Sequence, residues 1–120
     1  MTKKAFGWIG IDLDGTLAHY GEWMGVENIG DPVPRMLERV KEWIAAGEDV
    51  RIFTARVAGP DASEAAAYIT DWCVKHLGIP LPVTCKKDFA MRVLYDDRCV
   101  QIVTNKGEDA VDAALAKYTR

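Results

Sequence analysis

The chain has 120 residues, of which 49% are hydrophobic and 28% are charged, and its formal net charge is −3. This balance is typical of a folded globular protein and excludes a disordered or fibrous chain, and the length suits one domain spanning residues 1–120. The net charge gives no general attraction to nucleic acid. No apolar run is long enough to span a membrane and no secretory cleavage pattern occurs, so we expect a cytoplasmic protein with no membrane partner.

The first half of the chain predicts a strand, a helix and a second strand. Residues 5–12 are almost continuously apolar, as in strands covered on both faces. A glycine-rich loop with aromatic residues follows, and Asp31 and Pro32 then indicate the start of a helix that ends at Gly47. Residues 49–55, "DVRIFTA", predict the second strand.

The second half continues the alternation. Asp61 is a candidate helix cap with Glu64 as its reciprocal partner, and "GIP" ends that helix. A short strand "LPVTC", a loop "KKDFA", a strand "MRVLYDD", a fifth strand "CVQIV" and a closing helix "GEDAVDAALAKYT" follow. The whole pattern predicts an α/β class, a three-layer Rossmann-like domain whose mostly parallel sheet has about five strands, with helices on both faces.

Three cysteines, Cys73, Cys85 and Cys99, are odd in number and widely spaced. They form no C-x-x-C pair, so they indicate neither a disulfide framework nor a zinc site. We expect three buried thiols.

Acidic residues follow two of the predicted strands. Asp12 is the last residue of the first predicted strand and Asp14 follows two positions later. A carboxylate at such a place is costly unless it is paired, hydrogen-bonded or bound to a metal. Asp96 and Asp97 end the fourth strand, and Thr54 ends the second. Because binding sites of open α/β sheets lie beyond the carboxyl ends of the strands, we expect these side chains to converge there.

The chemistry of such a set points to a bound phosphoryl group. Several carboxylates with room for water and phosphate favour Mg²⁺, while Thr54 and Lys87 offer a hydroxyl donor and a cation to phosphoryl oxygens. Lys86 is adjacent to Lys87, and the sequence leaves open which of the two reaches the site. An aspartate beside the metal can attack phosphorus, so Asp12 is the candidate nucleophile and Asp14 the candidate acid-base residue.

These residues lie in a recognisable order. "DLDGT", "FTAR", Lys87 and "LYDDR" resemble the four motifs of the haloacid dehalogenase-like (HAD) hydrolase superfamily, over about residues 6 to 103. The resemblance implies a Rossmann-like sheet, Mg²⁺ dependence and hydrolysis of phosphate esters. Its motifs imply the following roles: Asp12 as nucleophile and metal ligand, Asp14 as acid-base residue and backbone-carbonyl ligand, Thr54 and Lys87 as phosphate-binding residues, and Asp96 and Asp97 as metal-holding residues. The sequence leaves open which of Asp96 and Asp97 contacts the metal directly and which acts through water.

Within that superfamily, "DDR" before an apolar strand is similar to the phosphatase domain of polynucleotide kinases. The kinase half is excluded because no G-x-x-x-x-G-K-[ST] occurs. The segments between the motifs are too short for an inserted cap domain, so we expect a capless protein with an open site. The expected partner is a phosphorylated substrate, either a small molecule or a nucleic-acid end.

Two other functions share this pattern. A phospho-accepting signalling module also gathers acids, threonine and lysine at a sheet edge, but its acceptor follows the third strand, whereas D-x-D-G-T here follows the first. A non-catalytic binding module would keep the scaffold without turnover. The sequence fixes neither the substrate nor the oligomeric state, nor whether residues 20–24, with Tyr20, Trp23 and Met24, face the substrate or pack over the sheet.

Overall fold

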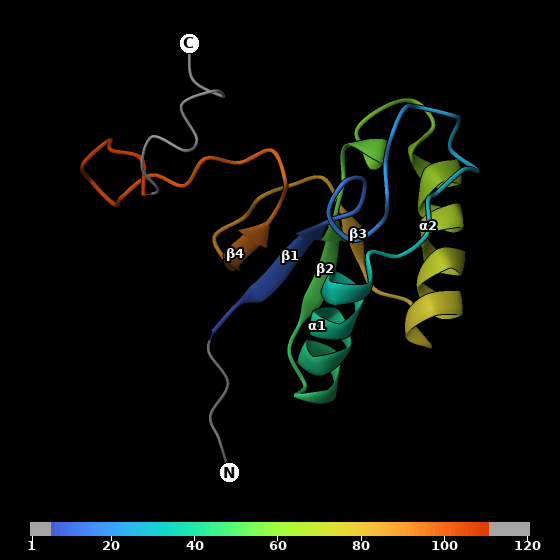
Figure 1. The fold of residues 1–120 in the computed structure, drawn as a ribbon, viewed down its shortest axis with the longest axis horizontal. Helices are drawn as coiled ribbons and strands as arrows, with labels where there is room; N and C mark the ends of the chain where they lie inside the picture. The colour runs from blue at the N-terminus through green and yellow to red at the C-terminus, as the bar shows by residue number, and fades with distance from the viewer. Residues whose placement is uncertain (1–5, 111–120) are drawn as a thin grey trace.

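A computed structural model of the chain describes residues 6–110, which form an α/β fold around a parallel sheet (Figure 1). The sheet has four strands in the order β3-β2-β1-β4, and every neighbouring pair is parallel. The expectation of about five strands is therefore wrong by one for this part of the chain. The strands are β1 (Trp8–Asp12), β2 (Val50–Phe53), β3 (Val83–Thr84) and β4 (Met91–Tyr95).

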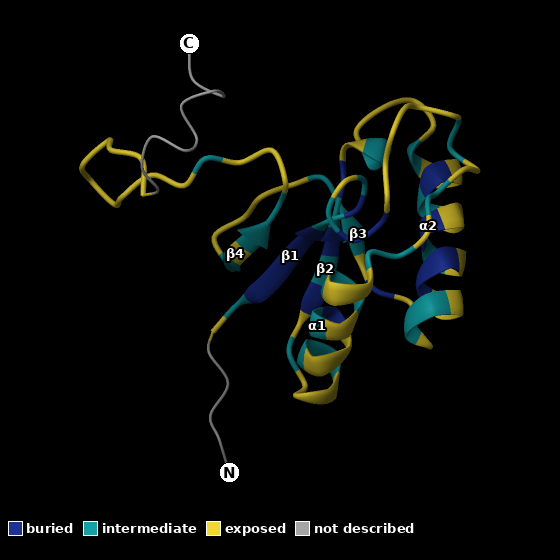
Figure 2. Cartoon of the chain, in the orientation of Figure 1, coloured by how far each residue is buried: buried dark blue, intermediate teal, exposed yellow. Residues whose placement is uncertain are grey.

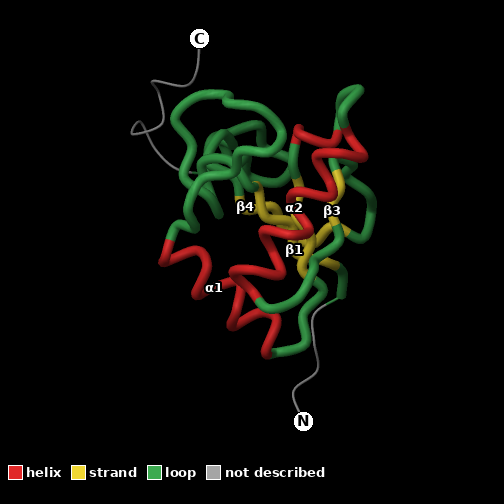
Figure 3. The backbone as a smooth tube through the Cα atoms, turned by 90° about the vertical axis from the view of Figure 1, so that its right-hand side faces the viewer, coloured by secondary structure: helices red, strands yellow, loops and turns green. Residues whose placement is uncertain are grey.

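Two α-helices, α1 (Pro34–Ala45) and α2 (Ala62–Leu77), cover one face of this sheet (Figure 3 gives a side view). Ile11 and Ile52 are Cα partners on adjacent parallel strands, so their side chains point to the same face. Both pack in one buried cluster with Val40 of α1 and Ile69 of α2. Residues 6–110 thus hold a single helical layer, and the expected helices on both faces are not found in this part of the chain.

The opposite face of β1 is closed by a side chain instead of a helix. The indole of Trp8 is 1% exposed and lies beside Gly10, where an added Cβ would come within 3.0 Å of the ring. The guanidinium of Arg51 stacks 4.7 Å from the ring centroid, and the indole N–H donates to Asp88 Oδ1 at 2.9 Å. Consequently β1 is buried along most of its length (Figure 2).

The helix ends differ in detail from the sequence expectations. The first helix begins at Pro34 because Pro32 forms an isolated bridge with Ala18 before the helix starts. At the second helix Asp61 is the N-cap residue, but its side chain makes no capping hydrogen bond, so the expected capping box is absent. Gly78 ends the helix in the left-handed conformation at φ 85°, which agrees with the end predicted at "GIP".

No helix within residues 6–110 combines the length and the apolar character needed to cross a membrane.

The segment after β4 is not the expected fifth strand. It turns back on itself through an isolated antiparallel bridge between Ile102 and Asp109, and Asn105 occupies the turn at φ 65°. Its backbone hydrogen bonds run to residues 108–110 instead of to β4, and the side chains of Ile102 and Val103 stay exposed (Figure 2). The closing helix expected at residues 107–119 is not helical up to residue 110, and its remainder lies outside the described residues.

The cysteines do not share one environment. All three are free thiols, as expected, but Cys73 alone is buried, Cys85 is half-buried and Cys99 is exposed. Burial raises the pKa of the Cys73 thiol to about 11, which keeps it protonated and unreactive.

Candidate active site

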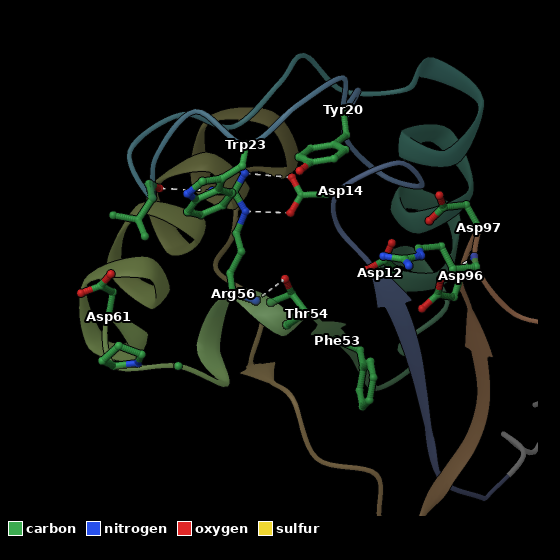
Figure 4. A pocket seen from close by; sticks show the side chains of 15 residues that line it. Asp12, Asp14, Tyr20, Trp23, Phe53, Thr54, Arg56, Asp61, Asp96 and Asp97 are labelled. Carbon is green, nitrogen blue, oxygen red and sulfur yellow. Dashed lines mark hydrogen bonds and ion pairs between the residues drawn. The ribbon is translucent and has the colours of Figure 1, made fainter.

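A cavity of about 520 Å³ opens at the carboxyl edge of the sheet (Figure 4). Its volume lies within the roughly 300–1,000 Å³ range of small-molecule sites. It is lined by residues that follow β1, β2 and β4 and by the loop after β1, so segments far apart in the sequence meet here. The polar lining residues are Asp12, Asp14, Thr54, Arg56, Asp61, Asp96, Asp97 and Arg98.

Three carboxylates form a cluster on one side of this cavity. Asp12 is the last residue of β1, while Asp96 and Asp97 follow the last residue of β4. One carboxylate oxygen of each lies within 4.8 Å of the others. The backbone N–H of Arg98 donates to Asp96 Oδ1 at 2.8 Å and fixes that side chain. Three carboxylate oxygens at this spacing are a ligand set that suits a hard divalent cation such as Mg²⁺.

Thr16 joins the two halves of the cluster, a role that the sequence reasoning missed. Its Oγ1 lies 3.3 Å from Asp12 Oδ2 and 3.1 Å from Asp97 Oδ1, and it accepts the Asp97 N–H at 3.0 Å. Gly15 makes room, because a Cβ at its φ of 91° would lie 2.6 Å from Asp97 Oδ2. The threonine of "DGT" is the sequence signal for this contact, but the motif was given no role for Thr16.

The cluster perturbs the acidity of Asp12. Burial is the largest cause that raises the pKa of Asp12 from its ordinary 3.8 to about 8, followed by a hydrogen bond with the Asp97 carboxyl and the charges of Asp96 and Asp97. The Thr16 hydroxyl acts in the opposite direction. Without a cation, Asp12 is therefore largely protonated at neutral pH.

This raised pKa predicts a pH-dependent stability. The protonated carboxyl favours the folded state, so its stabilisation is complete below pH 3.8 and is lost as the pH rises through about 8. In chelator, urea unfolding of the wild type should show a midpoint that falls more between about pH 6 and about pH 9 than that of Asp12→Asn, which has no group to titrate. Parallel pH dependences of the two proteins would contradict the raised pKa.

Asp14 faces away from the cluster and pairs with Arg56. The guanidinium donates from Nε to Asp14 Oδ2 at 2.7 Å and from Nη2 to Oδ1 at 2.8 Å, and the Arg56 side chain is only 5% exposed. The same guanidinium donates to the carbonyls of Val26 and Asn28 in the loop after β1. Arg56 thus holds both the candidate acid-base residue and the loop above it (Figure 4).

Thr54 lies at the base of the cavity, directly after β2. It is 2% exposed, and its Oγ1 accepts the backbone N–H of Arg56 at 3.1 Å, which begins the short 3-10 helix η1 (Ala55–Val57). Within residues 6–110 its hydroxyl proton donates to no protein group. Thr54 therefore offers a fixed donor to a ligand in the cavity.

The structure does not bring Lys87 to this cavity. Lys86 and Lys87 are both exposed, and neither lines it. They follow β3, the edge strand separated from β1 by β2. The cations that line the cavity are Arg56 and Arg98, so the structure brings together Asp12, Asp14, Thr54, Asp96 and Asp97 but not the expected lysine.

Comparisons with known proteins give a fold likeness. No protein-family model matches the chain, and no curated protein matches it. A solved structure of a conserved protein from Bacteroides thetaiotaomicron is similar, with 21% sequence identity and a TM-score of 0.55 over 80% of this chain and 79% of that chain. This likeness agrees with the α/β fold.

Proposed function

We propose that this protein is a Mg²⁺-dependent phosphomonoesterase of the HAD type, acting through an aspartyl-phosphate on Asp12. The sequence motifs resemble that superfamily, and the cavity gathers the acids and the threonine of those motifs. The observation that carries the proposal is the cluster of Asp12, Asp96 and Asp97, built from two distant segments at the carboxyl edge of a parallel sheet.

The residues of the cluster fit a magnesium ion. The three grouped ligand atoms are all carboxylate oxygens, which Mg²⁺ prefers. Their mutual repulsion, which helps to raise the pKa of Asp12, is relieved when a cation binds between them. When bound, Mg²⁺ would keep Asp12 ionised and offset the charge of the phosphoryl oxygens. The backbone carbonyl of Asp14, which the resemblance assigns as a further ligand, belongs to the same proposal.

The reaction uses the chain's own side chains in two displacements. A carboxylate oxygen of Asp12 attacks phosphorus, the bond from phosphorus to the leaving oxygen breaks, and Asp14 gives that oxygen a proton. Asp14 then takes a proton from water as the water attacks phosphorus, which releases inorganic phosphate and regenerates the Asp12 carboxylate. Thr54 donates to a phosphoryl oxygen throughout.

The ion pair between Asp14 and Arg56 adds a requirement. A carboxylate held by both oxygens in a bidentate pair cannot also carry the proton that the leaving oxygen needs. We propose that the phosphoryl group takes over the N–H donors that Arg56 gives to Asp14 and so frees Asp14, while the guanidinium keeps its hydrogen bonds to the loop carbonyls. Arg56, with Arg98 beside the cluster, then supplies the positive charge that the sequence assigned to Lys87.

A panel of phosphate esters tests this function. Nucleotides, sugar phosphates, an aryl phosphate and 3′-phosphorylated oligonucleotides should be assayed for phosphate release with Mg²⁺ and with chelator. We expect release from at least one ester with Mg²⁺ and none with chelator. A long-lived phosphoryl adduct without turnover would instead support a phospho-accepting module, and neither adduct nor turnover would support a binding module.

A further inference from the structure

We infer that the loop after β1 carries an aromatic subsite, formed by Tyr20 and Trp23, that binds a planar ring in the leaving group of the phosphate ester. This inference rests on the proposed function and names the substrate class: phosphate monoesters that carry an aromatic ring, either an aryl group or a nucleobase. Three observations carry it.

The first is the exposure of both rings at the cavity. Tyr20 is 49% exposed and Trp23 is 54% exposed, yet both line the cavity that holds the acids. Within the described residues, Tyr20 makes no hydrogen bond or ring contact. An exposed aromatic side chain buries little apolar area and so contributes little to the stability of the fold, but it offers a large apolar face on which a ligand can stack.

The second observation is that Trp23 is held in place. The guanidinium of Arg56 lies 4.8 Å from the centroid of the Trp23 ring. This same guanidinium pairs with Asp14. Arg56 also fixes the backbone of the loop, because its guanidinium donates hydrogen bonds to the carbonyls of Val26 at 3.3 Å and Asn28 at 2.8 Å. A ring ordered before binding loses less entropy when a ligand stacks on it.

The third observation is the position of the two rings relative to the reaction. Asp12 and the other two cluster acids lie on one side of the cavity, while Asp14 points to the other side, toward Arg56, with Tyr20 above it and Trp23 beside it in the view of Figure 4. Asp14, Tyr20 and Arg56 also border a second, adjoining cavity together. Because Asp14 is proposed to act on the leaving oxygen, the leaving group extends toward these rings.

Three probes share one phosphate chemistry and differ in the ring. An aryl phosphate carries the ring on the ester oxygen, a nucleoside 5′-monophosphate carries it one sugar away, and ribose 5-phosphate carries none. For the ring-bearing probes, Tyr20→Ala and Trp23→Ala should lower kcat/KM by about 5- to 150-fold, the range that stacking on an aromatic side chain gives. Ribose 5-phosphate should be hydrolysed as by the wild type.

Two further variants serve as controls. Trp23→Phe keeps a ring face and should recover most of the loss. Phe89→Ala removes a fully exposed ring outside the cavity and should leave kcat/KM unchanged on all three probes. If Tyr20→Ala and Trp23→Ala lose kcat/KM on the aryl phosphate alone, the subsite binds a ring attached to the ester oxygen. If they lose it on the nucleotide alone, the subsite binds a nucleobase.

Other outcomes overturn the inference. An equal loss on all three probes would mean that Trp23 only steadies Arg56, and no loss on any probe would mean that the rings touch no substrate. If the wild type hydrolyses neither these three probes nor any other ester of the panel with Mg²⁺, the proposed phosphatase function fails. The subsite is then decided by calorimetry: tighter binding of the nucleotide than of ribose 5-phosphate, lost in Tyr20→Ala, supports it, and equal binding refutes it.

Discussion

Replacing Asp12 by Asn is expected to lower phosphate-ester turnover by at least about 10³-fold, because the amide cannot attack phosphorus. The fold should persist, since Asn fills nearly the same space at the end of β1. Removing one of three crowded carboxylates should also raise the melting temperature of the metal-free protein. Turnover assays and thermal unfolding in chelator measure the two effects.

The same variant separates metal binding from other stabilisation. Mg²⁺ should raise the melting temperature of the wild type, because a ligand bound only by the folded state stabilises it, and should raise that of Asp12→Asn much less. Asp71→Asn is the matched control, as Asp71 is exposed on α2 and lines neither cavity. Unchanged turnover of Asp12→Asn would remove Asp12 from the role of nucleophile.

Replacing Arg56 by Lys should lower kcat/KM on the order of 10²-fold, as the loss of one preorganised donor to the phosphoryl oxygens does. Lysine keeps the positive charge but cannot bind both oxygens of Asp14 and the two loop carbonyls at once. The lost charge-assisted hydrogen bonds should reduce the free energy of unfolding by about 1–3 kcal/mol. Steady-state kinetics and urea unfolding measure these changes.

A double-mutant cycle shows whether Arg56 acts through Asp14. If the pair is coupled, the unfolding free energies lost in Arg56→Lys and Asp14→Asn will not add in the double variant. Arg92→Lys is the control. Arg92 forms an ion pair with Glu48, with a distance of 3.1 Å between Nη2 and Oε2, and neither residue lines the cavity. Additive losses, with full activity in Arg56→Lys, would exclude the proposed exchange of Arg56 between Asp14 and phosphate.

The sequence predicted those parts of the molecule that local patterns determine. Apolar runs and glycine stops located β1, β2, β4 and both helices to within a few residues. Acids placed directly after strands could be assigned to one sheet edge, because parallel strands all end there. That rule needs no knowledge of the loops, which is why Asp12, Asp96 and Asp97 were grouped correctly before their distances were known.

The parts that failed depend on tertiary pairing and on the path of loops. "CVQIV" has the apolar character of an edge strand, but its hydrogen bonds run to residues 108–110, and such competition cannot be read from a local pattern. Lys87 follows a strand of two residues, so nothing local fixes where the chain goes next. No local pattern indicates the role of Thr16, because its partner Asp97 is 81 positions away.

The pairing of β1 with β4 sets the order in which the site can be assembled. Trp8 and Asp88, which close this pairing on one side, are 80 positions apart, so contact between them carries a large loop-closure cost during folding. A nascent or partly unfolded chain that lacks β4 can hold Asp12 but not the two acids that complete its surroundings. The proposed metal site is therefore complete only in chains in which β4 has paired with β1.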